Sequence, residues 1–160
     1  MAGELIKQKI TKALIAKLEE ITIANGYDTD LGLNVFAWKV GEFNEVDLPA
    51  CSLNSVNSTW EISSMTRHQW SVRYELEAVA RASEDAALVL DQLEADIMRA
   101  LGSFVRLESQ IISPNYHTTI EDCEHGVRMT EKRLVGIRLR FTSTFSTKIW
   151  DPYARDVTTI

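Results

Sequence analysis

The chain has 160 residues, of which 45% are hydrophobic and 25% are charged. These values are typical of a soluble globular domain and exclude wholesale disorder, and the length suits one domain with a sizeable core. The formal net charge of −6 argues against binding to nucleic acid through phosphate contacts, because that affinity comes mainly from clustered Lys and Arg.

Cysteine usage and the N-terminus indicate the compartment. Cys51 and Cys123 are far apart and form no CxxC motif, which favours free thiols in a reducing compartment over a disulfide. The opening MAGELIKQKI lacks the apolar core of a signal peptide, and no segment reaches the roughly 18 apolar residues of a membrane span. We therefore expect a soluble protein, made in the cytoplasm, with no membrane association.

An amphipathic helix is predicted from Glu4 to about Ala24, because apolar residues recur there every three or four positions. Asn25 and Gly26 follow, and both tolerate the left-handed backbone angles of a helix C-cap. The apolar positions of this helix are Ile6, Ile10, Leu14, Leu18 and Ile21.

Two strands are predicted next. Leu33 to Val40 is apolar on both faces, so we interpret it as a strand buried on both sides, or buried on one side with the other at a subunit contact. Residues 48–56, LPACSLNSV, predict a strand with Pro49 near its start. The polar stretch 54–66, NSVNSTWEISSMT, predicts a long mobile loop or an extended hairpin.

Residues 67–80, RHQWSVRYELEAVA, alternate more clearly than any other segment and predict a strand with one face on the core. The other face meets water or a partner. The core face holds His68, Trp70, Val72, Tyr74, Leu76, Ala78 and Ala80, and the polar face holds Gln69, Ser71, Arg73, Glu75 and Glu77.

A second helix is predicted after this strand. Ser83 is a candidate N-cap, and Glu84 and Asp85 suit the first helical turn. The helix is expected to run to Gly102, its C-cap candidate. Its apolar positions are Leu90, Leu93, Ile97 and Leu101.

The rest of the chain is predicted to be β. Strands are expected at Ile111 to Glu121 and at Leu134 to Ser146, with a turn at Gly126 between them. The order of elements predicts an α+β domain over residues 1–146, with a mostly antiparallel or mixed sheet of about five strands and two main helices on one face. Residues 147–160 break the pattern and are expected to form a C-terminal arm that leaves the domain.

One region is dense in potential metal ligands. If residues 117–125 stay extended, His117, Glu121, Cys123 and His125 would project from one face, as a zinc site requires. The spacing matches no zinc signature, and the polar end of a hairpin has the same composition. We therefore expect no metal and no cofactor.

Other chemistry has weaker support. Asp28 and Asp30 lie in a turn without the EF-hand pattern, so calcium is not expected. The chain has no GxSxG motif, phosphate-binding glycine loop or HExxH motif to activate Cys51 or Cys123. His68 lies on the apolar face of its strand and is interpreted as a core or rim histidine. We expect no catalytic residue.

The order of these segments resembles small phage tail proteins of the tail terminator (tail completion, minor tail protein) family. The likeness covers nearly the whole chain and rests on the order of structural motifs. The N-terminal helix is followed by NGYDTDLG (25–32), LNVFAWKV (33–40) and DLPACSL (47–53), and the second half holds LDQLEADIMRAL (90–101) and VGIRLRFTSTFSTKIWDPYA (135–154).

The resemblance implies a virion structural protein that forms a ring, usually of six subunits, on the last ring of the tail tube. Such a ring stops tube growth after the tape-measure protein has set the length, and it presents the surface for the head-side connector or stopper protein. DNA would pass through the bore without being read. The protein would be assembled in the host cytoplasm and end in the virion, at the head-proximal end of the tail.

Alternatives remain open. Another phage neck protein, such as a head-closure or connector-completion protein, shares the small size and ring symmetry. A small enzyme or metal-binding domain would use His117, Cys123 and His125. A heterologous ring uses two different patches per subunit, and the candidate interface residues are Arg73, Glu75 and Glu77 on the polar strand face, Trp60 and Met65, and Trp150 and Tyr153 in the arm.

Overall fold

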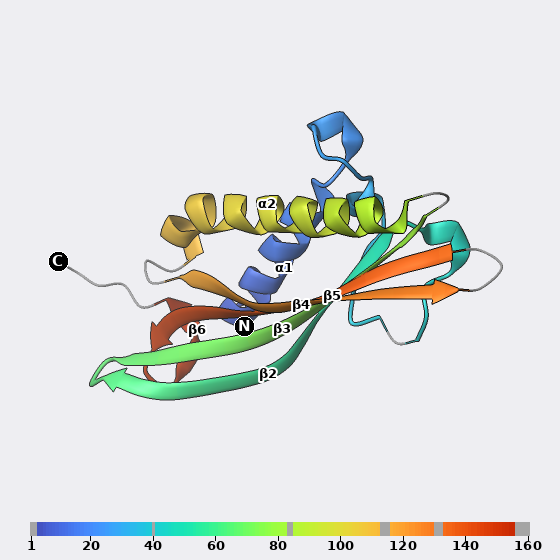
Figure 1. The fold of residues 1–160 in the computed structure, drawn as a ribbon. Coiled ribbons are helices and arrows are strands. Elements are labelled where there is room, and N and C mark those ends of the chain that lie inside the picture. Colours follow the sequence, from blue (N-terminus) through green and yellow to red (C-terminus); the bar gives the residue numbers. More distant parts are fainter. Residues whose placement is uncertain (1–2, 40, 83–84, 113–115, 130–132, 156–160) are drawn as a thin grey trace.

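The computed structural model describes residues 3–39, 41–82, 85–112, 116–129 and 133–155. Within this part of the chain, two α-helices lie on one face of a mixed six-stranded sheet (Figure 1). The predicted α+β class is therefore confirmed. The elements are α1 (Ile6–Glu19), β1 (Val35–Ala37), β2 (Ala50–Ser64), β3 (Arg67–Arg81), α2 (Ala86–Ile112), β4 (His117–Met129), β5 (Arg133–Lys148) and β6 (Asp151–Arg155).

The sheet has the strand order β1-β2-β3-β5-β4, with β6 paired to β5. Among the described residues, β1 and β2 run parallel and the other pairs are antiparallel. The inner face of the sheet packs on the helices. It carries alternate residues of the central strands β3 and β5, such as Tyr74 opposite Phe141 and Leu76 opposite Leu139. The alternation predicted for residues 67–80 and the strand predicted at 134–146 are thus confirmed. Burial of the inner-face side chains supplies much of the folding free energy.

Helix α1 ends earlier than predicted. Ile6, Ile10, Leu14 and Leu18 form its buried stripe, as expected, but the helix stops at Glu19. Thr22 is extended and caps a separate 3₁₀ turn at Ile23–Asn25, which ends at Gly26 with a φ of 86°. The predicted left-handed cap therefore exists but closes this short turn, because the extended residue has already interrupted the α-helix.

The strand predicted at Leu33 to Val40 is much shorter and lies at an edge. Leu31–Leu33 form a 3₁₀ turn, and only Val35–Ala37 pair with β2. The residues of β1 are half-buried or exposed, so the expectation of burial on both faces is wrong. An edge strand has one neighbour, and neither of its faces is fully covered here.

The polar stretch 54–66 is mostly strand. Strand β2 continues to Ser64 and pairs with β3 along its length, with irregular register near Val56 and Ser63. Of the two predicted alternatives, the extended hairpin is the observed one. Its Asn and Ser residues favour turns over strands, and the ladder to β3 overrides that local preference.

Three predictions for the second half are wrong. Helix α2 continues through Gly102 to Ile112, so the strand predicted from Ile111 begins only at His117. An isolated glycine costs a helix only about 1 kcal/mol, which neighbouring residues can offset. Gly126 pairs with Gly136 inside the β4–β5 ladder and does not form a turn. The candidate cap Ser83 and its neighbour Glu84 lie outside the described residues.

The expected C-terminal arm folds back over part of its length. Thr147 and Lys148 belong to β5, and Asp151–Arg155 pair with that strand as β6. The structure therefore contradicts an arm that leaves the domain at residue 147, as far as the described residues reach. The backbone of Ile149 also donates to Thr66 O, which fixes the start of this segment against the β2–β3 turn.

Candidate functional site

Aromatic side chains gather where the β2–β3 hairpin ends. Trp60 and Trp70 lie opposite each other on the inner face with ring centroids 5.2 Å apart, and Trp70 stacks on Phe145 at 6.0 Å. The indole Nε1 of Trp70 donates to Thr147 Oγ1 at 2.9 Å. This stack orients Trp60, yet 55% of that residue stays exposed.

Trp150 extends the same surface from the turn between β5 and β6. Its φ of 57° is in the left-handed region, where a bulky residue is strained. Its backbone N–H donates to His68 Nδ1 at 3.3 Å, and its ring meets the buried His68 ring edge-on at 4.5 Å. His68 is buried, as predicted for a core residue, but its Nε2 has no hydrogen-bond partner among the described residues. In contrast, 73% of Trp150 remains exposed.

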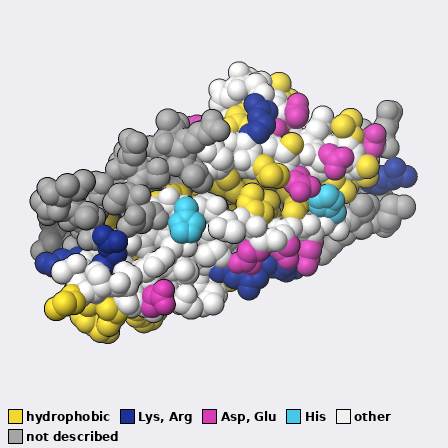
Figure 2. Space-filling model, turned by 60° about the vertical axis from the view of Figure 1, so that its left-hand side comes forward, with side chains coloured by type: hydrophobic (Ala, Val, Ile, Leu, Met, Phe, Trp, Pro, Cys, Tyr) yellow, Lys and Arg dark blue, Asp and Glu magenta, His cyan; other side chains and the backbone are white. Residues whose placement is uncertain are grey.

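We call this surface the hairpin end. Figure 2 shows hydrophobic side chains gathered at the lower left of the molecule, the end at which Figure 1 places the hairpin turn. A contiguous group of exposed apolar side chains is characteristic of an interaction surface. The hairpin end comprises Trp60, Ile62, Met65, Trp150 and Tyr153, which are 55%, 58%, 93%, 73% and 44% exposed.

The polar face of β3 forms an ion-pair network with the neighbouring strands. Arg73 Nη2 lies 2.8 Å from Glu121 Oε2, and Arg138 Nε donates to Glu77 Oε1 at 2.9 Å. Arg140 lies between strands β3 and β4 and contacts Glu75, Asp122 and Glu124. Hydrogen bonds to these carboxylates raise the pKa of both Arg138 and Arg140.

This network bears on the interface candidates Arg73, Glu75 and Glu77, because their charges are already paired within the subunit. Arg138 and Arg140 were not predicted as site residues. Their alternation with the buried Ile137, Leu139 and Phe141 could have revealed them, since alternate residues of a strand share a face. Their pairing with particular acids depended on the register between β3 and β5.

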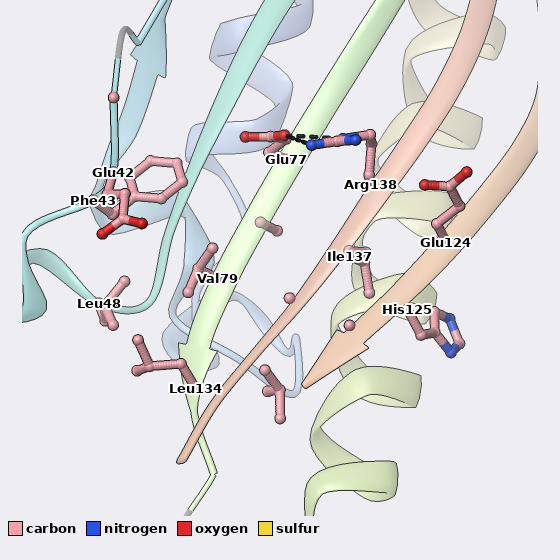
Figure 3. A pocket seen from close by; sticks show the side chains of 15 residues that line it. Glu42, Phe43, Leu48, Glu77, Val79, Glu124, His125, Leu134, Ile137 and Arg138 are labelled. Atoms are coloured by element: carbon pink, nitrogen blue, oxygen red, sulfur yellow. Dashed lines mark hydrogen bonds and ion pairs between the residues drawn. The ribbon is translucent and has the colours of Figure 1, made fainter. Parts of the chain in front are cut away.

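A groove lies on the outer face at the other end of the sheet. It has a volume of about 490 Å³ and is bounded by the loop before β2 and by strands β3, β5 and β4. Figure 3 shows Phe43 and Leu48 on the loop side, with the Glu77–Arg138 pair across the strands. A Cβ at Gly136 would lie 3.2 Å from the backbone oxygen of Ala78, so a side chain at this position in the groove would be crowded by β3.

The predicted metal ligands are separated by a β-bulge. The register of the β4–β5 ladder shifts between Ile120 and Asp122. The extra residue in β4 moves the side chains that follow it to the opposite face of the sheet. Glu121 therefore bonds to Arg73 and Thr142 on the outer face. His117 pairs in register with Thr144, which also faces outward, whereas Cys123 and His125 lie on the inner face.

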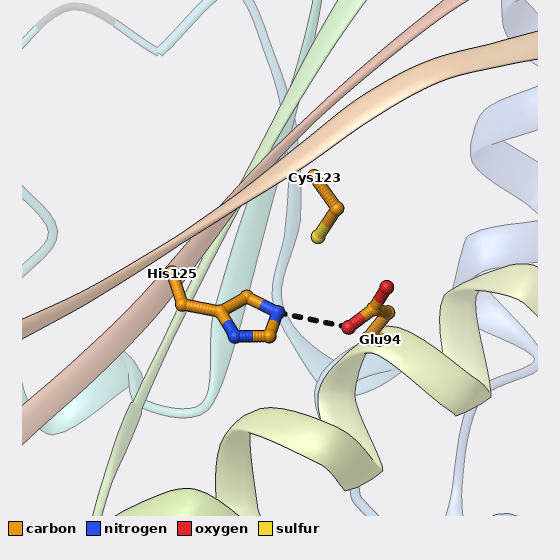
Figure 4. A group of neighbouring side chains, drawn as sticks. All are labelled: Glu94, Cys123 and His125. Atoms are coloured by element: carbon orange, nitrogen blue, oxygen red, sulfur yellow. Dashed lines mark hydrogen bonds and ion pairs between the residues drawn. The ribbon is translucent and has the colours of Figure 1, made fainter.

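Cys123 and His125 lie close to Glu94 of α2, which was not among the predicted ligands (Figure 4). His125 Nε2 lies 2.8 Å from Glu94 Oε2. Burial and the nearby carboxylates of Glu94 and Asp122 raise the pKa of the Cys123 thiol to about 11. The thiol of Cys51 is fully buried in the core, and desolvation raises its pKa to about 12.

Asp28 and Asp30 have structural contacts. Asp30 Oδ1 accepts the backbone N–H of Ile23 at 2.9 Å, and the backbone N–H of Asp28 donates to Asp96 Oδ1 at 3.1 Å. The turn is therefore organised by hydrogen bonds to α2 and to its own backbone.

No family model matches the chain, and no curated protein matches its sequence. Neither described helix combines the length and apolar character needed to cross a membrane.

Proposed function

We propose that the protein is a structural subunit that assembles with copies of itself into a ring on the end of a phage tail tube. The observation that carries the proposal is the presence of two different surfaces at opposite ends of the sheet. The hairpin end offers exposed aromatic side chains, and the groove offers an open recess. His68 and Val79 are eleven positions apart in β3, which corresponds to about 36 Å of strand.

Two unlike surfaces on one subunit suit a head-to-tail contact. A heterologous interface of this kind generates a ring when the rotation between subunits closes. The walls of the groove include the apolar side chains of Phe43, Leu48, Val79 and Leu134. We propose that they receive Trp60 and Met65 of the next subunit, because large apolar side chains entering a recess are the usual anchors of protein interfaces.

The wider role follows from the resemblance of the segment order to tail terminators. The ring, a hexamer in that family, would stop growth of the tail tube protein and present a surface to the head-side connector or stopper. Its position at the tube end would bring it near the tape-measure protein, and DNA would cross its bore unread. In the virion it would lie at the head-proximal end of the tail.

The experiment uses one variant for each surface. Trp60→Ala/Met65→Asp removes the apolar anchors of the hairpin end, where Met65 is 93% exposed and has little packing to lose. Gly126→Leu fills the groove, because the nearest atom to an added Cβ is Gly136 O at 3.9 Å. Charge reversal at Glu75 and Glu77 is less informative, since it would place cations beside Arg138 and Arg140.

Light scattering over a wide concentration range, with negative-stain images, measures assembly with and without purified tube protein. We expect the unmodified chain to form rings, alone or on tube ends, and each variant alone to stay monomeric. An equimolar mixture of the two variants should form heterodimers and no rings, because each variant retains one intact surface. Ile23→Ala, at a residue 60% exposed in the turn after α1, is the control and should assemble normally.

Two results would separately contradict the ring and the pair of surfaces that we propose for it. A chain that stays monomeric and leaves tube growth unchanged would reject the ring. Rings that form equally well from both variants would keep the ring but reject this pair of surfaces. Circular dichroism and thermal unfolding of each variant distinguish a lost interface from a lost fold.

A further inference from the structure

Three side chains with metal-binding atoms converge between α2 and β4. Figure 4 shows Cys123 and His125 pointing from β4 toward Glu94 on the helix. One ligand atom from each residue lies within 4.8 Å of the other two. Cys123 and His125 are two positions apart on one strand, so the pleat places them on the same face, and the helix supplies the third group.

The spacing is close to that of a tetrahedral zinc site. Zinc bonds of about 2.0–2.3 Å to nitrogen, oxygen and sulfur place neighbouring ligand atoms about 3.5 Å apart. His125 and Glu94 already approach to 2.8 Å through their hydrogen bond. Zinc binding would change separations of up to 4.8 Å between these ligand atoms to about 3.5 Å, and the rotatable side chains of Glu94 and Cys123 can contribute to that change.

The ligand types favour zinc over calcium or magnesium. Thiolate and imidazole bind borderline and soft metals, whereas calcium and magnesium prefer oxygen ligands alone. Glu94 and Cys123 are partly buried and His125 is exposed, so an ion can enter from solvent. We propose that Glu94, Cys123 and His125 bind one zinc ion, with a fourth position left for water or an incoming ligand.

This proposal departs from the expectation that the sequence supported. The sequence predicts that His117, Glu121, Cys123 and His125 share one face. The bulge instead places His117 and Glu121 on the outer face and leaves the other two on the inner face. The third ligand comes from α2, 29 residues before Cys123 in the chain. The inference does not depend on ring assembly, because the three residues belong to one subunit.

Bound zinc would join α2 to the edge of the sheet. Strand β4 is the last strand in the sheet order, with β5 as its only neighbour in the ladder among the described residues. A bond network from β4 to the helix would restrain this edge beside the groove, which Glu124, His125 and Gly126 line. Zinc should therefore raise the thermal unfolding temperature, since a ligand that binds only the native state stabilises it.

The experiment measures zinc and cobalt binding by the reduced, metal-stripped chain. Isothermal titration with Zn²⁺ should give one ion per chain. Co²⁺, a spectroscopic substitute, should give a thiolate charge-transfer band and the visible bands of tetrahedral coordination. Cys123→Ser should abolish the charge-transfer band, and His125→Ala and Glu94→Gln should each weaken zinc binding by at least about tenfold.

The matched controls carry the same residue types on other surfaces. His117→Ala should leave zinc binding unchanged, because His117 lies on the outer face with Thr144. Cys51→Ala should retain the cobalt band, because the Cys51 thiol is buried in the core. Thermal unfolding without metal shows whether each variant is folded before it is titrated.

Several results would overturn the proposal. Absence of stoichiometric zinc binding by the unmodified chain would leave Glu94 and His125 as an ordinary hydrogen-bonded pair. A cobalt band that persists in Cys123→Ser would assign the metal elsewhere. Equal losses of affinity in His117→Ala and His125→Ala would indicate unspecific binding to surface histidines.

Discussion

Asp96 lies in the middle of α2, and its carboxylate is fully buried. Its oxygens accept the backbone N–H groups of Asp28 and Thr29 at 3.1 and 2.8 Å, and the Thr29 hydroxyl at 2.8 Å. Arg99 lies 3.7 Å away. A buried charge is tolerated when it is paired and hydrogen-bonded in this way, so the residue holds the turn after α1 against α2.

Asp96→Ala should lower the free energy of unfolding by about 2–4 kcal/mol, because it removes three hydrogen bonds and leaves partly buried backbone donors without a partner. Urea denaturation measures the change. Asp91→Ala, at an exposed position on the same helix, should have an effect within about 0.5 kcal/mol. Equal effects of the two substitutions would show that the Asp96 contacts do not hold the turn.

At the scale of elements, the backbone conformation at Gly102 distinguishes the predicted end of the second helix from the observed one. The sequence predicts a C-cap there, which would require a left-handed backbone, whereas the structure places Gly102 inside a 27-residue helix. An added Cβ at this position would have no atom within 4 Å, and φ lies outside the left-handed region. A C-cap at Gly102 and a helix that continues through Gly102 therefore predict opposite effects of Gly102→Ala on the free energy of unfolding.

Gly102→Ala should raise the free energy of unfolding by about 0.5–1 kcal/mol, because alanine restricts the unfolded chain and favours helix more than glycine does. Gly26→Ala is the contrasting control, because φ is 86° at Gly26 and a side chain there is strained. Thermal unfolding by circular dichroism measures both. Destabilisation by Gly102→Ala would mean that the helix ends where the sequence predicted.

At the scale of the whole molecule, the helices cover only part of the length of the sheet. Residues Ala50–Leu53 of β2 are buried, whereas residues 60–64 are exposed, since the hairpin extends past the helices (Figure 1). The long hairpin is therefore well packed at one end and open at the other. Segments with few buried contacts open locally at lower free energy than the core.

Amide hydrogen exchange should follow this gradient. Amides at 58–66 should exchange through local opening and be less protected than those of Val72–Ala80 in β3, which lie between two strands under the helices. Mass spectrometry of peptic fragments gives both rates. Assembly should slow exchange in 58–66 and leave β3 unchanged, and uniform protection along the hairpin before assembly would contradict the uneven cover.

The sequence by itself determined the fold class and the strongest elements. Alternation in β3 and β5 and the apolar stripe of α1 depend on side-chain direction, which repeats every two residues in a strand and about every 3.6 in a helix. These periods are local, so they are visible without a structure. The same alternation assigned Arg73, Glu75 and Glu77 to the outer face, although it could not show that Arg138 and Arg140 pair with them.

Only the tertiary structure decided the features that depend on pairing between distant segments. The polar half of β2 became strand because β3 lies beside it, and the bulge at Glu121 reversed the faces of the residues after it. Glu94 joined Cys123 and His125 because α2 crosses β4 at that point. Each outcome depends on contacts between residues far apart in the chain, and local periodicity carries no information about those contacts.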